Sequence, residues 1–170
     1  MGASEQIAEH PELLVTDSPD ETMAVAAEFA RYCRPNDVVG LRGTLGAGKT
    51  CFVKGMARGL GVEDLRRVTS PTFVLLQQYP GRLMLYHFDA YRLDHAGSME
   101  EIGCEETFES GGVSVVEWAD HVIECLPGEH FLWTIRMAGR HRRELLLTAE
   151  GQNHRARLPE IREALRRWRD

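Results

Sequence analysis

The octapeptide GTLGAGKT, residues 43–50, narrows the folds open to this chain of 170 residues. It matches the phosphate-binding loop pattern G-x-x-x-x-G-K-[ST], follows an apolar stretch at 37–42 and precedes a helical pattern that reaches Leu60. Glycines let backbone N–H groups face phosphate oxygens, the lysine ammonium can reach the outer phosphates, and the threonine hydroxyl can ligate Mg2+. The pattern predicts a nucleoside triphosphate site. The alternative is a glycine-rich turn that only caps a helix.

Periodicity and turn residues around this loop predict an α/β fold in which helices flank a mixed β-sheet. Ser18, Pro19 and Glu21 mark a helix start as N-cap, first helical residue and capping-box partner. The buried stripe expected on that helix is Met23, Ala26, Ala27, Ala30 and Cys33. The expected strands are 13–16, 37–42, 73–79, 82–89, 113–117, 131–137 and 144–148, and the expected helices are 18–33, 48–60, two short ones within 98–110, and 158–169.

The length and composition fit one P-loop NTPase-like domain over residues 1–170, with a core at about 13–150 and an arginine-rich C-terminal helix at about 158–169. The four cysteines are far apart and are expected to be free thiols. No stretch has the length of a membrane span or the form of an export signal, so a cytoplasmic protein without a membrane partner is expected.

Charge is distributed unevenly along the chain. Ten of the 20 Lys and Arg residues, but only five of the 26 Asp and Glu residues, lie in the last 35 positions. Such a basic tail permits contact with RNA or with an acidic protein surface, although a solvated helix face explains it as well.

Two carboxylates follow apolar strands and are candidate Mg2+ ligands. Asp89 ends the stretch 83–88, and Glu117 ends 113–116. Because ligands of α/β proteins collect at the carboxyl edge of the sheet, both side chains are expected to face the phosphates. Either residue alone could equally cap a helix or form a salt bridge. Trp118 is expected to contact the nucleotide or to pack against a neighbouring helix.

A Ser-Pro-Thr segment lies where many P-loop proteins place a sensor of the terminal phosphate. Thr72 could complete the magnesium shell or grip that phosphate, or the segment could be a plain turn before a strand. His87, His95 and His121 show no catalytic or metal-ligand spacing and are interpreted as surface or core residues. The only lysines lie at 49 and 54, so the Asn-Lys-x-Asp element that reads guanine is absent and ATP is the expected nucleotide.

Several blocks, in this order and spacing, resemble the TsaE family, formerly called YjeE, the bacterial ATPases of tRNA threonylcarbamoyladenosine biosynthesis. They are GTLGAGKT at 43–50, TSPTF at 69–73, YHFDAYRL at 86–93, VEWAD at 116–120 and Gly139-Arg140. The loop is shared with many NTPases, whereas the later blocks in this order are specific. The resemblance covers about 16–148, and residues 155–170 extend beyond it.

The resemblance implies ATP and Mg2+ as cofactors. It implies that Lys49 holds phosphates, that Thr50 and Glu117 ligate the metal, and that Asp89 is needed for hydrolysis by orienting water or metal. Thr72 corresponds to the phosphate-sensing threonine. The other residues that it places at the nucleotide are Gly43, Thr44, Leu45, Gly46, Ala47, Gly48 and Cys51 of the loop, with Thr22 near the base, Trp118, and Arg140 in a turn.

The resemblance also implies partners, the proteins TsaD and TsaB, which transfer threonylcarbamoyl to adenosine 37 of tRNA. On this basis the chain is expected to be a partner-activated ATPase that does not perform the transfer and meets tRNA only weakly or indirectly. Two other functions fit the loop: a small-molecule kinase with Arg140 to Arg143 as a lid, and an ATP-dependent adaptor that does not need hydrolysis.

Overall fold

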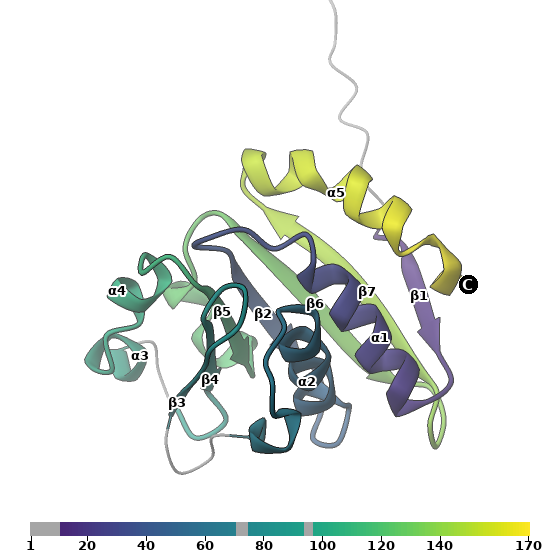
Figure 1. Cartoon of the computed structure of the whole chain (residues 1–170), viewed down its shortest axis with the longest axis horizontal. Coiled ribbons are helices and arrows are strands. Elements are labelled where there is room, and N and C mark those ends of the chain that lie inside the picture. The colour runs from purple at the N-terminus through teal and green to yellow at the C-terminus, as the bar shows by residue number, and fades with distance from the viewer. Residues whose placement is uncertain (1–10, 71–74, 94–96) are drawn as a thin grey trace, which may run out of the picture.

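A computed structural model describes residues 11–70, 75–93 and 97–170 of the chain. Its centre is a seven-stranded mixed sheet with the strand order β1-β7-β6-β2-β5-β4-β3 (Figure 1). The strands are β1 (Leu13–Thr16), β2 (Val38–Arg42), β3 (Leu76–Tyr79), β4 (Leu85–Asp89), β5 (Val113–Glu117), β6 (His130–Met137) and β7 (Arg143–Glu150). The helices are α1 (Pro19–Ala30), α2 (Lys49–Gly59), α3 (Gly97–Glu101), α4 (Cys104–Phe108) and α5 (Gln152–Ala164), with short 3-10 turns η1 (Leu65–Arg67), η2 (Ala119–Cys125) and η3 (Arg166–Trp168).

The middle of the sheet is parallel and its edges are antiparallel. Strands β6, β2, β5 and β4 run in one direction, whereas β7 and β1 extend one side and β3 the other in antiparallel pairs. Parallel strands end at a common edge, and here Glu117 of β5 pairs with Leu41 of β2 on one side and with Asp89 of β4 on the other. The expected α/β class with a mixed sheet is confirmed.

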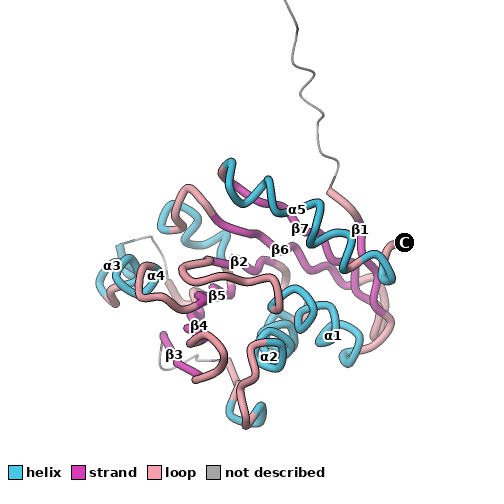
Figure 2. Tube along the Cα trace, turned by 45° about the horizontal axis from the view of Figure 1, so that its top comes forward, coloured by secondary structure: helices cyan, strands magenta, loops and turns pink. Residues whose placement is uncertain are grey.

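Helices cover both faces of the sheet, and Figure 2 shows α1 and α2 together, apart from α3 and α4. Helices α1, α2 and α5 share one core with the strand residues that point toward them, such as Val115 and Trp133. The neighbouring residues Val116 and Leu132 point to the other core, under α3, α4 and η2. This alternation follows from the two-residue period of a strand.

The α1 helix differs from its predicted form in its end and in its buried face. It ends at Ala30 rather than near Cys33, and Val25 and Phe29 are buried where the predicted stripe had partly exposed Met23 and Ala27. The Ser18 hydroxyl accepts from the Glu21 N–H as predicted. The Glu21 carboxylate accepts from the Asp17 N–H, one residue before the N-cap.

The C-terminal helix begins earlier than predicted. The sequence predicts this helix over about 158–169, but α5 begins at Gln152 and carries Pro159 inside it. Glu129 explains the earlier start, because its carboxylate accepts from the backbone N–H groups of Asn153 (3.2 Å) and His154 (3.0 Å). Because the capping carboxylate lies 24 residues upstream of Asn153, the sequence around the start of α5 carries no capping pattern.

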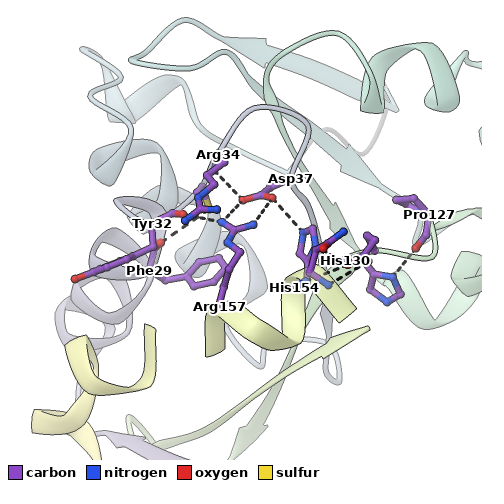
Figure 3. A network of polar contacts seen from close by, with 11 residues as sticks. Phe29, Tyr32, Arg34, Asp37, Pro127, His130, His154 and Arg157 are labelled. Carbon is purple, nitrogen blue, oxygen red and sulfur yellow. Dashed lines mark hydrogen bonds and ion pairs between the residues drawn. The ribbon is translucent and has the colours of Figure 1, made fainter. Parts of the chain in front are cut away.

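A buried ion pair attaches α5 to the base of β2 (Figure 3). The Arg157 guanidinium donates to both oxygens of Asp37 at 2.7 Å and to the Tyr32 carbonyl at 2.8 Å. His154 Nε2 lies 3.1 Å from Asp37 Oδ1. The C-terminal segment is thus part of the fold.

Other expectations agree with the structure. Strands β3 and β4 form the predicted antiparallel hairpin, two short helices occupy 97–108, and none of the four cysteines, all in the described ranges, forms a disulfide. In the described parts of the chain, none of the helices combines the length and apolar character needed to cross a bilayer.

Candidate functional site

The glycine-rich loop lies between the end of β2 and the start of α2. Gly46 and Gly48 have φ values of 78° and 110°. Residues that carry a Cβ atom rarely adopt such positive values. Gly43 packs against β6 so closely that a Cβ atom would lie 2.5 Å from the Ile135 carbonyl oxygen. The glycines are therefore needed for the path of this loop, and not only to cap a helix.

Lys49 is buried at the centre of the loop and is 5% exposed. Its Nζ donates to the carbonyl oxygens of Gly43 (2.6 Å) and Thr44 (2.9 Å). It also lies 3.7 Å from the centroid of the Trp118 ring, a cation–π contact. Burial holds the pKa of Lys49 below its ordinary value, and the negative charge of Glu117 offsets this shift in part.

Trp118 owes its position to an unusual backbone conformation. Its φ of 58° is left-handed, which is uncommon for a large side chain and strained by about 1 kcal/mol or more. Its ring also contacts Tyr91 and His121, with centroid separations of 4.9 and 5.2 Å. An aromatic cluster therefore covers the ammonium of Lys49.

Thr50, Glu117 and His87 form a hydrogen-bonded chain across the loop and the sheet. The Thr50 hydroxyl donates to the Glu117 carboxylate, at 3.0 Å from Oε1 and 3.2 Å from Oε2. His87 Nε2 lies 2.8 Å from the same Oε1, and both Glu117 and His87 are buried. The first residues of α2 and the end of β5 meet here.

Asp89 ends the neighbouring strand, in register with Glu117. Its carboxylate accepts from the Ser70 hydroxyl and, at 2.9 Å, from the Tyr91 N–H. These bonds fix the carboxylate at the carboxyl edge of the sheet, where it was expected.

A cavity of about 400 Å³ joins these groups. It is lined by Leu45, Gly46, Gly48, Lys49, Thr50, Cys51, Ser70, Asp89, Tyr91, Glu117 and Trp118. Most of the predicted loop residues and both predicted carboxylates therefore share one cavity. A larger cavity near Cys104 and Cys125, of about 680 Å³, is lined by different residues.

The remaining predicted residues that the structure describes lie outside the lining of this cavity. Thr22 is buried in α1, where its hydroxyl is 2.8 Å from that of Thr16. Arg140 is exposed in the β6–β7 turn. Thr72, the predicted phosphate sensor, and His95 lie outside the described residues.

Arg143 is a residue whose contact with the loop the sequence did not predict. Its Nε donates to the Ala47 carbonyl at 2.7 Å, and a terminal nitrogen lies 3.4 Å from the Gly46 carbonyl. It also donates to the Gly139 carbonyl at 3.1 Å. The side chain thus ties the β6–β7 turn to the glycine-rich loop. The arginines of this turn were the only signal, and nothing in their spacing distinguished Arg143.

His87 is a second residue whose place in the site the sequence did not predict. Its spacing indicated only a surface or core histidine, but it lies against Glu117. Its position two residues before Asp89 in the same strand was the available signal, because alternate strand residues share a face.

The donor set of the cavity fits a magnesium nucleotide. Mg2+ prefers oxygen ligands and commonly combines one or two carboxylates with substrate phosphates and water. Thr50, Glu117 and Asp89 supply such oxygens, and Lys49 supplies a cation for phosphate. Within the described residues, no cluster of three or more His, Cys, Asp or Glu side chains forms a metal cage of protein ligands alone.

Comparisons with known proteins agree with this architecture. The family model described as "Threonylcarbamoyl adenosine biosynthesis protein TsaE" matches residues 16–145. The tRNA threonylcarbamoyladenosine biosynthesis protein TsaE of Bacillus subtilis is 44% identical over 140 residues, which are 82% of this chain and 86% of the relative. The TsaE protein of Treponema pallidum is 41% identical over 131 residues, 77% of this chain and 96% of the relative.

A solved structure shares the fold. The crystal structure of Bacillus subtilis YdiB matches with a TM-score of 0.74 at 37% identity. The match covers 94% of this chain and 98% of the YdiB chain. With the family match over most of the chain, these likenesses show that the chain belongs to the TsaE family of tRNA threonylcarbamoyladenosine biosynthesis proteins.

Proposed function

We propose that this protein binds ATP with Mg2+ in the cavity at the glycine-rich loop and hydrolyses it in support of tRNA threonylcarbamoyladenosine formation. The observation that carries the proposal is the hydrogen bond from the Thr50 hydroxyl to the Glu117 carboxylate. It joins the residue that follows the loop lysine to a strand-end carboxylate, and P-loop enzymes use this pair of groups to hold Mg2+.

The polar side chains that line the cavity have assigned roles in this proposal. Lys49 holds the outer phosphates, Thr50 and Glu117 ligate the metal, and Asp89 orients water or the metal shell. Bound Mg2+ would neutralise charge on the phosphate oxygens. Loop N–H groups and the N-terminus of α2 add favourable electrostatics for an anion.

The contacts of Lys49 are consistent with a phosphate ligand. Its ammonium is paired with two neutral carbonyl oxygens and an aromatic face. A phosphate anion is a stronger partner for a buried ammonium than either of these, because it adds the attraction of a full negative charge where the carbonyls and the ring offer only partial charges. Lys49 is therefore available for a phosphate ligand.

The partners proposed are TsaD and TsaB, with transfer to adenosine 37 performed by them rather than by this chain. Direct tRNA binding by the basic tail is not favoured, because several of its arginines are paired internally. Arg155 pairs with Glu150, Arg166 with Glu163 and Arg169 with Glu12, at 2.7, 2.7 and 2.9 Å. We propose that tRNA contacts this protein weakly or through its partners.

The first prediction concerns ATP hydrolysis with and without TsaD and TsaB. We expect slow phosphate release from the chain alone and faster release with the partners. Lys49→Ala and Asp89→Ala should each lower the stimulated rate about 100-fold, because the first removes the cation that holds the phosphates and the second removes the carboxylate that orients water or the metal shell. Lys54→Ala is the matched control, since Lys54 is the other lysine of α2 and does not line the cavity.

Three outcomes of this assay contradict the proposed mechanism. Full stimulated activity in Lys49→Ala or Asp89→Ala would reject the assigned roles. Transfer of labelled phosphate from ATP to a metabolite would instead indicate a kinase, although Arg142 and Arg143 are engaged with Asp17 and the loop rather than free to form a lid. Full complementation in cells by a Glu117→Ala variant that binds but does not hydrolyse ATP would indicate an adaptor.

A further inference from the structure

His87 lies directly behind the proposed metal carboxylate. It belongs to β4, is fully buried, and places Nε2 at 2.8 Å from Glu117 Oε1. The Thr50 hydroxyl contacts the same carboxylate from the loop. Glu117 is therefore held between one group from the neighbouring strand and one group from α2.

The chemistry of the pair fixes which nitrogen carries the proton. A carboxylate that ligates Mg2+ is ionised and can only accept hydrogen bonds. Nε2 must then be the N–H donor. Nδ1 is buried and has no hydrogen-bond partner in the described parts of the chain.

We propose that His87 is the positioning residue for Glu117, which its Nε2–H holds in the orientation that faces Thr50 and the metal. The inference rests on the proposed function, since it deepens the role of the same carboxylate. Ligating carboxylates commonly need such a supporting hydrogen bond, and its loss costs about 10-fold to 100-fold in metal affinity. His87 touches neither the nucleotide nor the metal in this arrangement.

The competing explanation is that His87 only fills the core. The ring of Tyr79 is also near His87, with 6.4 Å between the two ring centroids. A filler would affect the free energy of unfolding and leave the magnesium dependence of nucleotide binding unchanged. The two explanations therefore differ in a measurable way.

The first experiment uses the full chain without metal or nucleotide. Long-range 1H–15N spectra of the histidine rings should show a proton on Nε2 of His87. Glu117→Gln should shift the His87 ring nitrogens, because it replaces the carboxylate acceptor. An Nε2 without a proton, or no response to Glu117→Gln, would overturn the proposal even if the variants in the second experiment fail to fold.

The second experiment titrates MgCl2 into the full chain with a non-hydrolysable ATP analogue, followed by calorimetry. We expect His87→Leu to weaken the apparent Mg2+ affinity about 10-fold to 100-fold, with analogue binding in the absence of Mg2+ unchanged. His87→Gln, which offers an amide N–H at a similar reach, should restore part of the loss. His130→Leu is the matched control, because His130 is also buried but contacts the Pro127 carbonyl away from the site.

The outcomes distinguish a failure of the proposed function from a failure of the positioning role of His87. A wild-type chain without Mg2+-dependent analogue binding would reject the proposed function itself. Normal binding by wild type together with unchanged Mg2+ affinity in a folded His87→Leu would reject only the positioning role. A loss in His87→Leu that His130→Leu reproduces would identify a general core effect and overturn the proposal.

Discussion

Single residues at this site depend on partners that come from distant parts of the chain. Lys49 and Thr50 are recognisable in the sequence by their motif, but their contacts with Trp118 and Glu117 join segments more than 60 residues apart. The motif therefore identifies the side chains, and the sheet brings their partners to them. Arg143 illustrates the same point for the loop backbone, since it holds two loop carbonyls from the other end of the sequence.

The residue-scale prediction concerns Arg143. Arg143→Met removes the hydrogen bond from a charged donor to the carbonyl of Ala47, which is worth about 1.5 kcal/mol or more. We expect nucleotide affinity to fall about tenfold, because 1.4 kcal/mol corresponds to a factor of ten. Arg143→Lys should recover little, since an ammonium lacks the guanidinium fork. Calorimetric titration with an ATP analogue measures the change.

A neighbouring arginine provides the control for this prediction. Arg142 is half exposed and pairs with Asp17 at 3.0 Å, away from the loop carbonyls. Arg142→Met should leave the affinity within a factor of two or so. An equal loss in both variants would show that the total charge of the turn matters, and not the contact of Arg143 with the loop.

At the scale of elements, the close packing of α1 against α2 sets the position of the loop helix. Two glycines of α2 allow this approach. A Cβ on Gly55 would lie 2.4 Å from the Met23 carbonyl oxygen, and one on Gly59 would lie 2.3 Å from that of Ala27. Since α2 carries Lys49 and Thr50 at its start, this interface also fixes the cavity.

The element-scale prediction is that Gly55→Ala destabilises the protein. Alanine favours an isolated helix over glycine by about 1 kcal/mol, but overpacking against a backbone carbonyl costs about 3 kcal/mol. We expect a net loss of about 2 kcal/mol in the free energy of unfolding in urea. Arg58→Ala, at an exposed position of the same helix, should change it by less than about 0.5 kcal/mol. A gain in stability for Gly55→Ala would contradict the packing argument.

At the scale of the whole molecule, the ion pair of Asp37 and Arg157 closes the fold by holding the last helix to the sheet. Burial alone would raise the pKa of Asp37. Hydrogen bonds from Arg157, His154 and the Arg34 N–H outweigh it and hold the pKa below its ordinary value. A lowered pKa means that the contribution to stability is complete above the unfolded-state pKa, about 3.9, and is lost as the pH falls through the lower folded-state value.

The whole-molecule prediction follows from this sign. Arg157→Met should lower the free energy of unfolding by about 3 kcal/mol at pH 7, because it leaves a buried carboxylate without its main partner. The gap between variant and wild type should narrow as the pH falls below about 4. Urea unfolding between pH 7 and pH 3 measures both effects. The control Arg155→Met, at an exposed ion pair, should lower the free energy of unfolding by less than about 1 kcal/mol. A constant gap between Arg157→Met and wild type across this pH range would contradict the role given to the Asp37–Arg157 pair.

Much of the architecture could be predicted from local patterns. The strand β5, the β3–β4 hairpin and the loop followed by α2 agree with expectation because their apolar runs, turn residues and glycines act over a few positions. The start of α5 could not be predicted, because Glu129 caps it from a distant segment. The buried face of α1 was predicted incompletely, since contact with α2 and the sheet decides which of its small residues are covered.

The glycine-rich loop, the α/β class, the two strand-end carboxylates and the resemblance to the TsaE family can all be recognised without the structure. They depend on residue type, short spacing and order. The fold was needed to show that Glu117 lies between Thr50 and His87, that Trp118 covers Lys49, and that Arg143 supports the loop. Such contacts depend on the register of parallel strands and on helix packing, which bring together residues far apart in the sequence, where no periodic pattern links them.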